Sequence, residues 1–195
     1  MRYLPAFFAL AFSGMAWGQA GELWVNVGAS ILSNSGIGTA SAFGGGPNDV
    51  KLDDGYRFSF RFGFNQGERF GHEIQYAFNH TDLVQGGSST GMHFHQGGYN
   101  FLYYVMSEKS KFRLFGTGGV MFDDFIPPGG GINYGSQNKF GANFGGGVKV
   151  HVKGMWAVRF DVREYVSGKP DFGILVGSSG PLWQTEVSGG VGIGF

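Results

Sequence analysis

Hydrophobic and polar residues alternate along most of this chain, and the segment Tyr56–Asn65 shows the pattern most clearly. Its residues divide into an apolar set, Phe58, Phe60, Phe62 and Phe64, and a polar set, Arg57, Ser59, Arg61 and Gly63. Successive side chains of a β-strand point to opposite faces, so the segment predicts a strand with one apolar and one polar wall. Such a strand fits either a soluble sheet over a core or the wall of a membrane barrel.

The same alternation recurs along the chain and predicts eight strands. They are Glu22–Ser30, Tyr56–Asn65, Gly71–Thr81, Met92–Tyr104, Lys111–Phe122, Lys139–Val152, Trp156–Tyr165 and Trp183–Phe195. Glycines at 116, 118 and 119 leave the facing of the fifth strand ambiguous, and Gly97 and Gly98 are candidates for a β-bulge in the fourth.

The connections between these strands alternate in length. The longer ones are predicted loops at 31–55, 82–91, 125–138 and 166–182, and the short ones are turns at 66–69, 106–110 and 153–155. In an up-and-down meander every second connection emerges at the same end, so one end carries turns and the other carries loops. This asymmetry is typical of an outer-membrane barrel, with short periplasmic turns and long extracellular loops. The predicted fold is therefore all-β, an eight-stranded antiparallel up-and-down transmembrane β-barrel.

Charged residues lie on the polar wall of several strands and indicate which wall faces inward. A soluble barrel with an apolar interior would expose about twenty large apolar groups to water, far beyond a tolerated surface patch. The charged wall is therefore predicted to face a narrow lumen, which eight strands leave just wide enough for side chains to fill. We expect a plugging network of ion pairs, without an open pore for large solutes, formed by Arg57, Arg61, Glu73, Lys149, Arg159, Asp161, Arg163 and Glu186.

Composition narrows the function classes. The 195 residues are only 14% charged but 17% aromatic, and they include 38 glycines, which argues against both a disordered chain and a helical fold. The net charge is zero, so nucleic acid is not an expected partner. The chain has no Cys, which removes disulfides, a thiolate nucleophile and Cys-ligated metal sites.

Residues 1–20 have the features of a secretory signal peptide. One basic residue, Arg2, precedes an apolar run at 6–12, and the small residues Gly18 and Ala20 suit cleavage after position 20. The apolar run is shorter than the roughly 20 residues of a membrane-spanning helix. We therefore predict a signal peptide at 1–20 and one barrel domain at 21–195.

The mature chain resembles a known family, the small OmpA-like or opacity-like outer-membrane β-barrels. The resemblance extends from GELWVNVGAS through KFGANFGGGVKV and WAVRFDVREY to the final VSGGVGIGF. It implies a porin-like barrel in the outer membrane of a Gram-negative cell envelope. Val191, Ile193 and Phe195 resemble the terminal signal that the barrel-assembly machinery reads, so that machinery and periplasmic chaperones are implied as partners during biogenesis. Outer-membrane lipid and lipopolysaccharide are the implied surroundings, and a monomer is expected.

Few residues outside this lumen network suggest chemistry. His80 is predicted to lie opposite His93, near His95, in a cluster that could bind a transition metal, although polar rim residues of a barrel give the same pattern. Some related barrels modify lipid A with a Ser, a His and a carboxylate, but His80, Asp82, Ser88 and Ser89 do not form a convincing triad. We therefore expect no catalytic residues, metal or cofactor. The expected function is a structural or surface-interaction role in adhesion or envelope integrity, with a lipid A-modifying enzyme or a narrow channel as alternatives.

Overall fold

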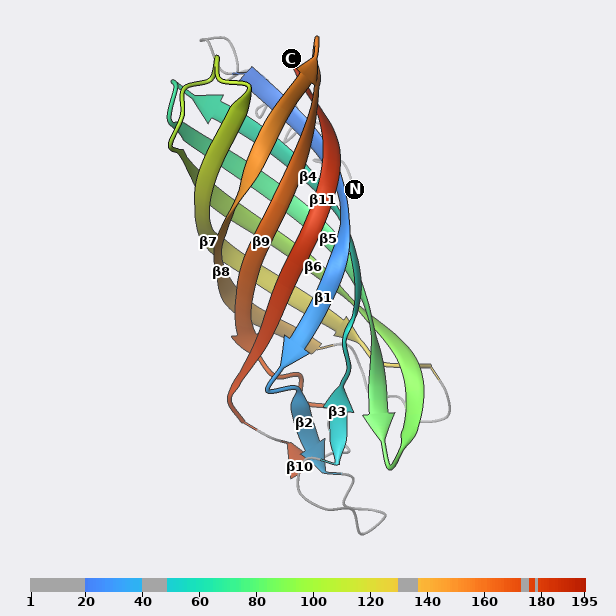
Figure 1. Cartoon of the computed structure of the whole chain (residues 1–195). Helices are drawn as coiled ribbons and strands as arrows, with labels where there is room; N and C mark the ends of the chain where they lie inside the picture. Colours follow the sequence, from blue (N-terminus) through green and yellow to red (C-terminus); the bar gives the residue numbers. More distant parts are fainter. Residues whose placement is uncertain (1–19, 40–48, 130–136, 173–175, 178) are drawn as a thin grey trace, which may run out of the picture.

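Eight long antiparallel strands form a closed barrel (Figure 1). The computed structural model describes residues 20–39, 49–129, 137–172, 176–177 and 179–195. The barrel strands are β1 (Ala20–Ser33), β4 (Gly55–Gln66), β5 (Phe70–Gln85), β6 (Ser88–Tyr104), β7 (Phe112–Ile126), β8 (Gln137–Lys153), β9 (Trp156–Gly168) and β11 (Pro181–Gly194). Each strand pairs with the next along the chain, and β1 pairs with β11 to close the wall. The predicted fold class is confirmed.

The two ends of the barrel differ as predicted. At one end, called the turn end, short connections follow β4, β6 and β8, and Gly67 and Gly154 take positive φ angles of 66° and 59°. The last residue, Phe195, exchanges two 2.8 Å backbone hydrogen bonds with Gly21 at this end. The other end, called the loop end, carries the longer connections after β1, β7 and β9, but only two residues join β5 to β6 there (Figure 1). No helix in the described part of the chain is long and apolar enough to span a bilayer.

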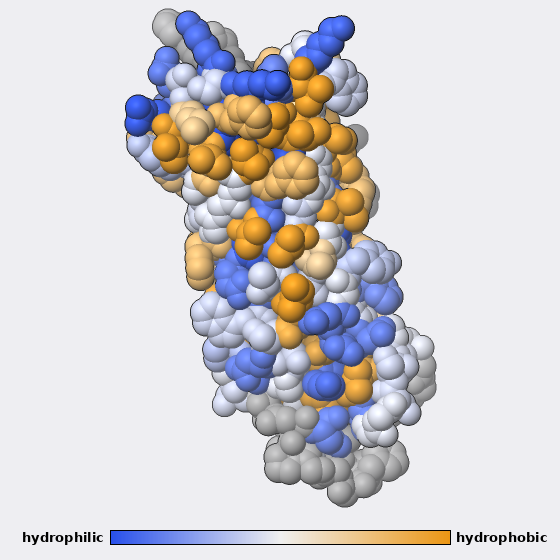
Figure 2. Space-filling view, viewed as in Figure 1, coloured by the Kyte–Doolittle hydropathy of each residue, from blue (hydrophilic) through white to orange (hydrophobic). Residues whose placement is uncertain are grey.

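Side chains alternate between a lumen face and an outer face, with the facing that the sequence predicts. In β4, for example, Phe58 and Phe60 are exposed on the outside, while Arg57 and Arg61 are buried inside. In β5 the outward apolar stretch runs from Phe70 to Phe78, about 26 Å along the strand at ~3.3 Å per residue. Hydrophobic side chains gather in the half of the barrel nearer the turn end, and the loop end is more polar (Figure 2). This apolar belt is the surface that meets lipid.

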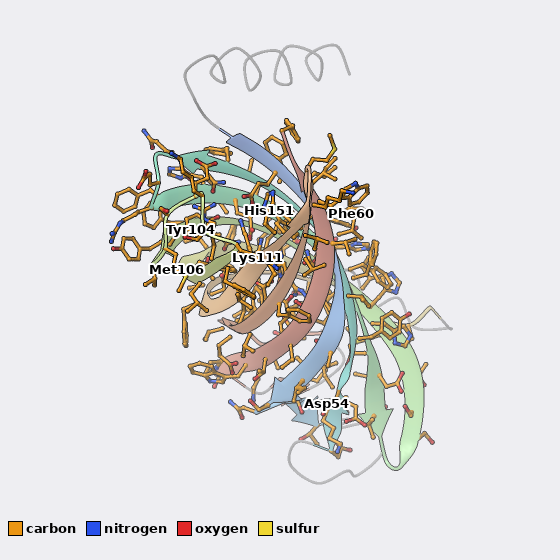
Figure 3. The ribbon with its side chains drawn as sticks, turned by 45° about the horizontal axis from the view of Figure 1, so that its top comes forward. Asp54, Phe60, Tyr104, Met106, Lys111 and His151 are labelled. Atoms are coloured by element: carbon orange, nitrogen blue, oxygen red, sulfur yellow. The ribbon has the colours of Figure 1, made fainter. Side chains whose placement is uncertain are left out.

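Phe60→Arg tests the lipid-facing assignment of β4. Phe60 lies near the middle of the strand, and its side chain is 45% exposed on the outer face (Figure 3). An arginine at the bilayer midplane costs about 2–4 kcal/mol, so the free energy of unfolding in lipid vesicles should fall by that amount. Gln66→Arg, at the turn end of the same strand, should change the free energy by less than about 1 kcal/mol, because interfacial positions tolerate charge. Equal effects of the two variants would contradict the assignment.

The glycine-rich parts of β6 and β7 pair without interruption. The register runs unbroken through Gly97 and Gly98, so the bulge suggested for these positions is wrong. A Cβ atom at Gly119 would lie 2.2 Å from the backbone oxygen of Tyr99, which shows that glycine there permits the close approach of β7 to β6. The facing of β7, ambiguous in the sequence, is resolved because Arg113 is buried in the lumen.

All four predicted loops contain β-structure, which corrects the sequence interpretation. Residues 31–55 include the end of β1, β2 (Gly36–Thr39) and β3 (Val50–Leu52), which join β10 (Val176–Gly177) and β5 in an extension of the sheet. Residues 82–91 form a β-hairpin that turns at Gly86 and Gly87, with φ angles of 56° and 83°. Residues 1–19 of the predicted signal peptide, most of GGGPND and the segment GGINYGS at 130–136 lie outside the described residues.

Candidate functional site

Seven charged side chains fill the middle of the lumen. They come from four strands, and none is more than 1% exposed: Arg57 and Arg61 of β4, Glu73 of β5, Arg159, Asp161 and Arg163 of β9, and Glu186 of β11. The two-residue period of each strand directs all of them inward. Together they form the lumen network, which brings seven of the eight predicted residues into mutual contact.

Asp161 is the centre of the lumen network. Its carboxylate accepts two hydrogen bonds from Arg159, at 2.7 and 2.9 Å, in the bidentate arrangement that makes Arg–carboxylate pairs strong. It also lies 3.0 Å from Nη1 of Arg61 and 3.1 Å from Nη2 of Arg163. Glu73, on the facing side of the barrel, pairs with Arg159 at 2.5 Å and Arg163 at 2.9 Å. These bonds cross the lumen and connect β9 to β4 and β5.

Glu186 connects the network to the strand that closes the barrel. It pairs with Arg61 at 2.6 Å and with Arg57 at 3.2 Å. The Tyr165 hydroxyl donates to Glu186 at 2.6 Å and accepts from Arg57 at 3.1 Å. Four guanidinium groups face three carboxylates here, so the basic excess needs neutral acceptors. Arg57 donates to the Gln96 side-chain oxygen at 2.5 Å, and Gln96 donates in turn to the buried Asp123 at 2.8 Å.

A second charged group lies nearer the turn end. Lys149, the eighth predicted residue, is buried there, forms an ion pair with Glu22 and donates to the Tyr104 hydroxyl at 2.6 Å. The Arg113 guanidinium lies 3.7 Å from the centre of the Tyr104 ring, a cation–π contact. Lys149, Glu22 and Arg113 line a cavity of about 270 Å³ that reaches His151 and Lys111 at the turn end (Figure 3).

The loop end is closed by an apolar core, which we call the cap. Its members are buried and come from barrel strands and from the extended sheet: Leu32, Ile37, Val50, Leu52, Leu83, Met92, Phe94, Phe125, Phe172 and Leu182. Phe94 and Phe125 pack with their ring centres 4.9 Å apart. The cap is fastened by polar contacts as well, since the Leu32 amide donates to Asp54 at 2.7 Å and the Leu52 amide donates to the Ser35 carbonyl at 3.0 Å.

The polarity of the two barrel faces reverses along the strands. In the belt the lumen face is polar, but at the loop end the inward positions Leu83, Met92 and Phe94 are apolar. Outward positions at the same height, such as His80 and Asp82, are polar. An apolar inside with a polar outside is the arrangement of a water-soluble barrel. The strands therefore continue past the lipid belt as a small soluble-type β-structure with its own core.

The three histidines of the predicted cluster, His80, His93 and His95, lie on the outer face where the apolar belt ends. His80 pairs with His93, as predicted, and stacks on Tyr56 with ring centres 5.0 Å apart. His95 accepts or donates a 2.6 Å hydrogen bond with the Tyr76 hydroxyl, and its ring meets the His93 ring edge-on at 5.7 Å. Within the described residues, no group of three or more His, Asp or Glu side chains is arranged to hold a metal ion.

The residues considered for a lipid-modifying triad, His80, Asp82, Ser88 and Ser89, do not come together in the structure. Ser89 pairs with Val84, four residues beyond His80, so about 13 Å of strand separates the serine from the histidine at ~3.3 Å per residue. Ser88 lies further out, next to the hairpin turn. The serines therefore do not reach the imidazole of His80.

The predicted assembly residues follow the outer face of β11. Val191 and Phe195 are 53% and 62% exposed, and Val191 and Ile193 pair with Val25 and Leu23 of β1. The Phe195 ring lies 6.5 Å from that of Phe62. These residues border the seam where the first and last barrel strands meet.

A closed eight-stranded barrel with a lipid-facing apolar belt and a charged lumen defines an integral membrane β-barrel protein. The family described as outer membrane protein beta-barrel domain matches residues 5–195. The chain belongs to this family, and the bacterial outer membrane is its location. No curated protein sequence matches the chain.

Solved structures share the fold at low sequence identity. Neisserial surface protein A (NspA) superimposes with a TM-score of 0.61 at 14% identity, covering 90% of this chain and 99% of that one. OprG from Pseudomonas aeruginosa gives 0.59 at 17% identity, covering 91% and 97%. The N-terminal β-barrel domain of Pseudomonas aeruginosa OprF gives 0.54 at 11% identity, covering 89% and 97%. At these identities the likeness establishes the fold.

Sequence reasoning missed several members of the site. Arg113 was not predicted because the glycines that follow it obscure the phase of its strand, and Glu22 was not among the predicted lumen residues. The neutral partners Gln96 and Tyr165 carry no charge signal and depend on cross-lumen distances. The cap was missed because most of its residues fall in segments predicted as loops, although the inward spacing of Met92 and Phe94, in the predicted strand Met92–Tyr104, was a usable signal.

Proposed function

We propose that the protein is a closed outer-membrane barrel that acts as a scaffold, with the β-structure around the cap as its surface-interaction region, and that it conducts no solutes. The observation that carries the proposal is the pairing of charges across the middle of the lumen, with the apolar cap beyond it. Asp161 and Glu73 bind guanidinium groups from opposite walls, so the charged side chains occupy the path that a solute would follow.

The cap supports an interaction role because this buried core holds β2, β3 and the β5–β6 hairpin together as preformed structure at the loop end. A partner that binds a preformed β-structure does not have to order a flexible loop, which lowers the entropic cost of binding. The loop end is expected to face the cell exterior, as in other outer-membrane barrels. Outer-membrane lipid is the proposed environment, and the assembly machinery with its chaperones the proposed biogenesis partners of a monomeric protein.

Planar-bilayer recordings test the closed lumen. The folded protein should give no steady single-channel openings above a detergent-only control, because the lumen network spans the barrel. Insertion of the protein into the bilayer is verified first. Reproducible openings of one size would favour the narrow channel instead.

Mass spectrometry of lipid A from cells that express the protein tests the enzyme alternative, and the spectrum should match that of cells without it.

Leu52→Ala tests the role of the cap. Leu52 is 1% exposed within the cap, and loss of such a side chain costs about 2–5 kcal/mol, so the cap should become sensitive to external protease while the barrel stays folded. Lys51→Ala, at the neighbouring exposed position of β3, is the matched control. Adhesion of expressing cells to protein- and glycan-coated surfaces should fall for Leu52→Ala alone. Adhesion that is the same with and without the protein on every surface would refute the interaction role.

A further inference from the structure

An apolar groove of about 680 Å³ crosses the outer wall of the barrel over β5, β6, β7 and β8. Its sides are large apolar residues: Ile74, Tyr76, Tyr99, Val120, Phe122 and Phe140. Gly97, Gly98 and Gly141 also line it. The volume falls within the range of about 300–1,000 Å³ that is typical of small-molecule sites.

The groove lies in the lipid-facing belt. Tyr76, Tyr99 and Phe122 on its sides are 47%, 44% and 47% exposed on the outer face. An empty groove there would deprive these side chains of dispersion contacts, and water would find few polar partners among them. The contents that fit these walls are hydrocarbon chains.

Polar residues adjoin the groove on the loop-end side. The strand register places Tyr76, Gly97, Phe122 and Phe140 in one row, and the next row toward the loop end is Phe78, His95, Asp124 and Asn138. His95 uses Nδ1 for its bond to the Tyr76 hydroxyl. The half-buried Asp124 has a carboxylate oxygen that is shielded from solvent and has no hydrogen-bond partner among the described residues. The row thus offers an imidazole and an unused carboxylate acceptor.

We propose that this face is a binding site for one phosphorylated glycolipid of the outer leaflet, with an acyl chain in the groove and the headgroup on the His95–Asp124 row. The groove supplies the apolar contact. His93 and His95 supply imidazole groups for phosphate oxygens, and Asp124 supplies an acceptor for a sugar hydroxyl or amide N–H. A headgroup that combines phosphate with sugar donors satisfies both, whereas a fatty acid offers no such donors. The site is separate from the cap and does not rest on the proposed surface-interaction role.

Native mass spectrometry of the full folded protein, released from detergent with added lipid A, tests the site. The wild type should retain one lipid A. Gly97→Leu places a side chain in the groove and should weaken retention about tenfold, because several methylene contacts are displaced. Gly116→Leu makes the same change on the outer face of β7, where the nearest atom to an added Cβ is 3.9 Å away, and should retain lipid as the wild type does.

A second variant covers the possibility that Gly97→Leu does not fold. A Cβ atom at Gly97 would meet the Phe122 ring at 2.5 Å, so this ring must move. Val120 is 65% exposed on the outer face, so Val120→Trp fills the same groove from outside the barrel and should give the same loss of lipid A. A heat-dependent gel shift confirms that each variant is folded.

The headgroup is tested separately. His95→Phe keeps an aromatic ring and removes its nitrogens, so it should lower lipid A retention about tenfold, the effect of losing one charge-assisted hydrogen bond. His72→Phe, nearer the turn end and outside the groove, is its control. Wild-type protein should likewise retain dephosphorylated lipid A less well than lipid A.

Three outcomes would overturn the proposal. Equal retention by wild type and both groove-filling variants would show that the groove does not hold the chain. Equal retention of phosphatidylethanolamine and lipid A would exclude a glycolipid site. A dimer mass without lipid, lost in Val120→Trp, would show that a second copy of the protein covers this face.

Discussion

Asp161→Asn is expected to lower the free energy of unfolding by about 3–5 kcal/mol, the usual effect of breaking a buried ion pair. Asp161 is 1% exposed and lies within hydrogen-bond distance of Arg61, Arg159 and Arg163. Asparagine keeps the shape but removes the negative charge, so the four guanidinium groups of the lumen network would share Glu73 and Glu186. Equilibrium urea unfolding in lipid vesicles, followed by tryptophan fluorescence, measures the change.

Glu68→Gln is the control for Asp161→Asn. Glu68 is exposed in the short turn after β4, and neutralising it should change the free energy by less than about 0.5 kcal/mol. A difference below about 1 kcal/mol between the two variants would show that water or a side-chain rearrangement compensates for the lost charge. The lumen network would then fill space without contributing much net stability.

The membrane part of the fold could be predicted because a strand carries its facing in its own sequence. Arg159, Asp161 and Arg163 alternate with Phe160 and Val162, and a period of two allows only one assignment of inside and outside. An even number of meandering strands then makes the first and last strands antiparallel, so that they can pair and close the wall. The sequence could predict that ion pairs cross the lumen, but not which residues pair. The pairing of Glu186 with Arg61, for example, depends on the register between β11, β1 and β4.

The cap could not be predicted in the same way because its residues obey the opposite rule. Leu83 and Met92 face inward, so the inner face here is apolar, the reverse of the polar inner face on which the strand predictions rest. The strand and the hairpin continue there, and only the solvent outside the wall changes. Where lipid gives way to water, the apolar face moves from the outside of the barrel to the inside.

The glycines of β6 and β7 limited the prediction for a different reason. Gly118 and Gly119 give no side chain from which to read facing, although their neighbours Thr117 and Val120 settle it once pairing is known. Gly97 suggested a bulge, but it leaves the register intact and opens the wall of the groove instead. Glycine in a strand marks a close approach or a missing side chain, and sequence alone does not separate the two.

Phe195→Ala is expected to remove most of the folded protein from the outer membrane while leaving the intrinsic stability of the barrel nearly unchanged. The family resemblance assigns Val191, Ile193 and Phe195 to the signal that the assembly machinery reads. In the folded barrel the Phe195 ring is 62% exposed toward lipid, so its loss sacrifices little packing. The amount of heat-modifiable protein in purified outer membranes, relative to total expressed protein, measures assembly.

Two comparisons separate recognition from folding in the Phe195 experiment. Phe140→Ala removes a ring that is 83% exposed on the same outer surface, outside the terminal signal, and should assemble normally. Purified Phe195→Ala refolded in detergent, without the machinery, should unfold within about 1 kcal/mol of the wild type. A refolding defect as large as the cellular one would mean that Phe195 acts by closing the seam between β1 and β11. Because alanine keeps the backbone bonds to Gly21, the lost ring and its position beside Phe62 would then account for the defect.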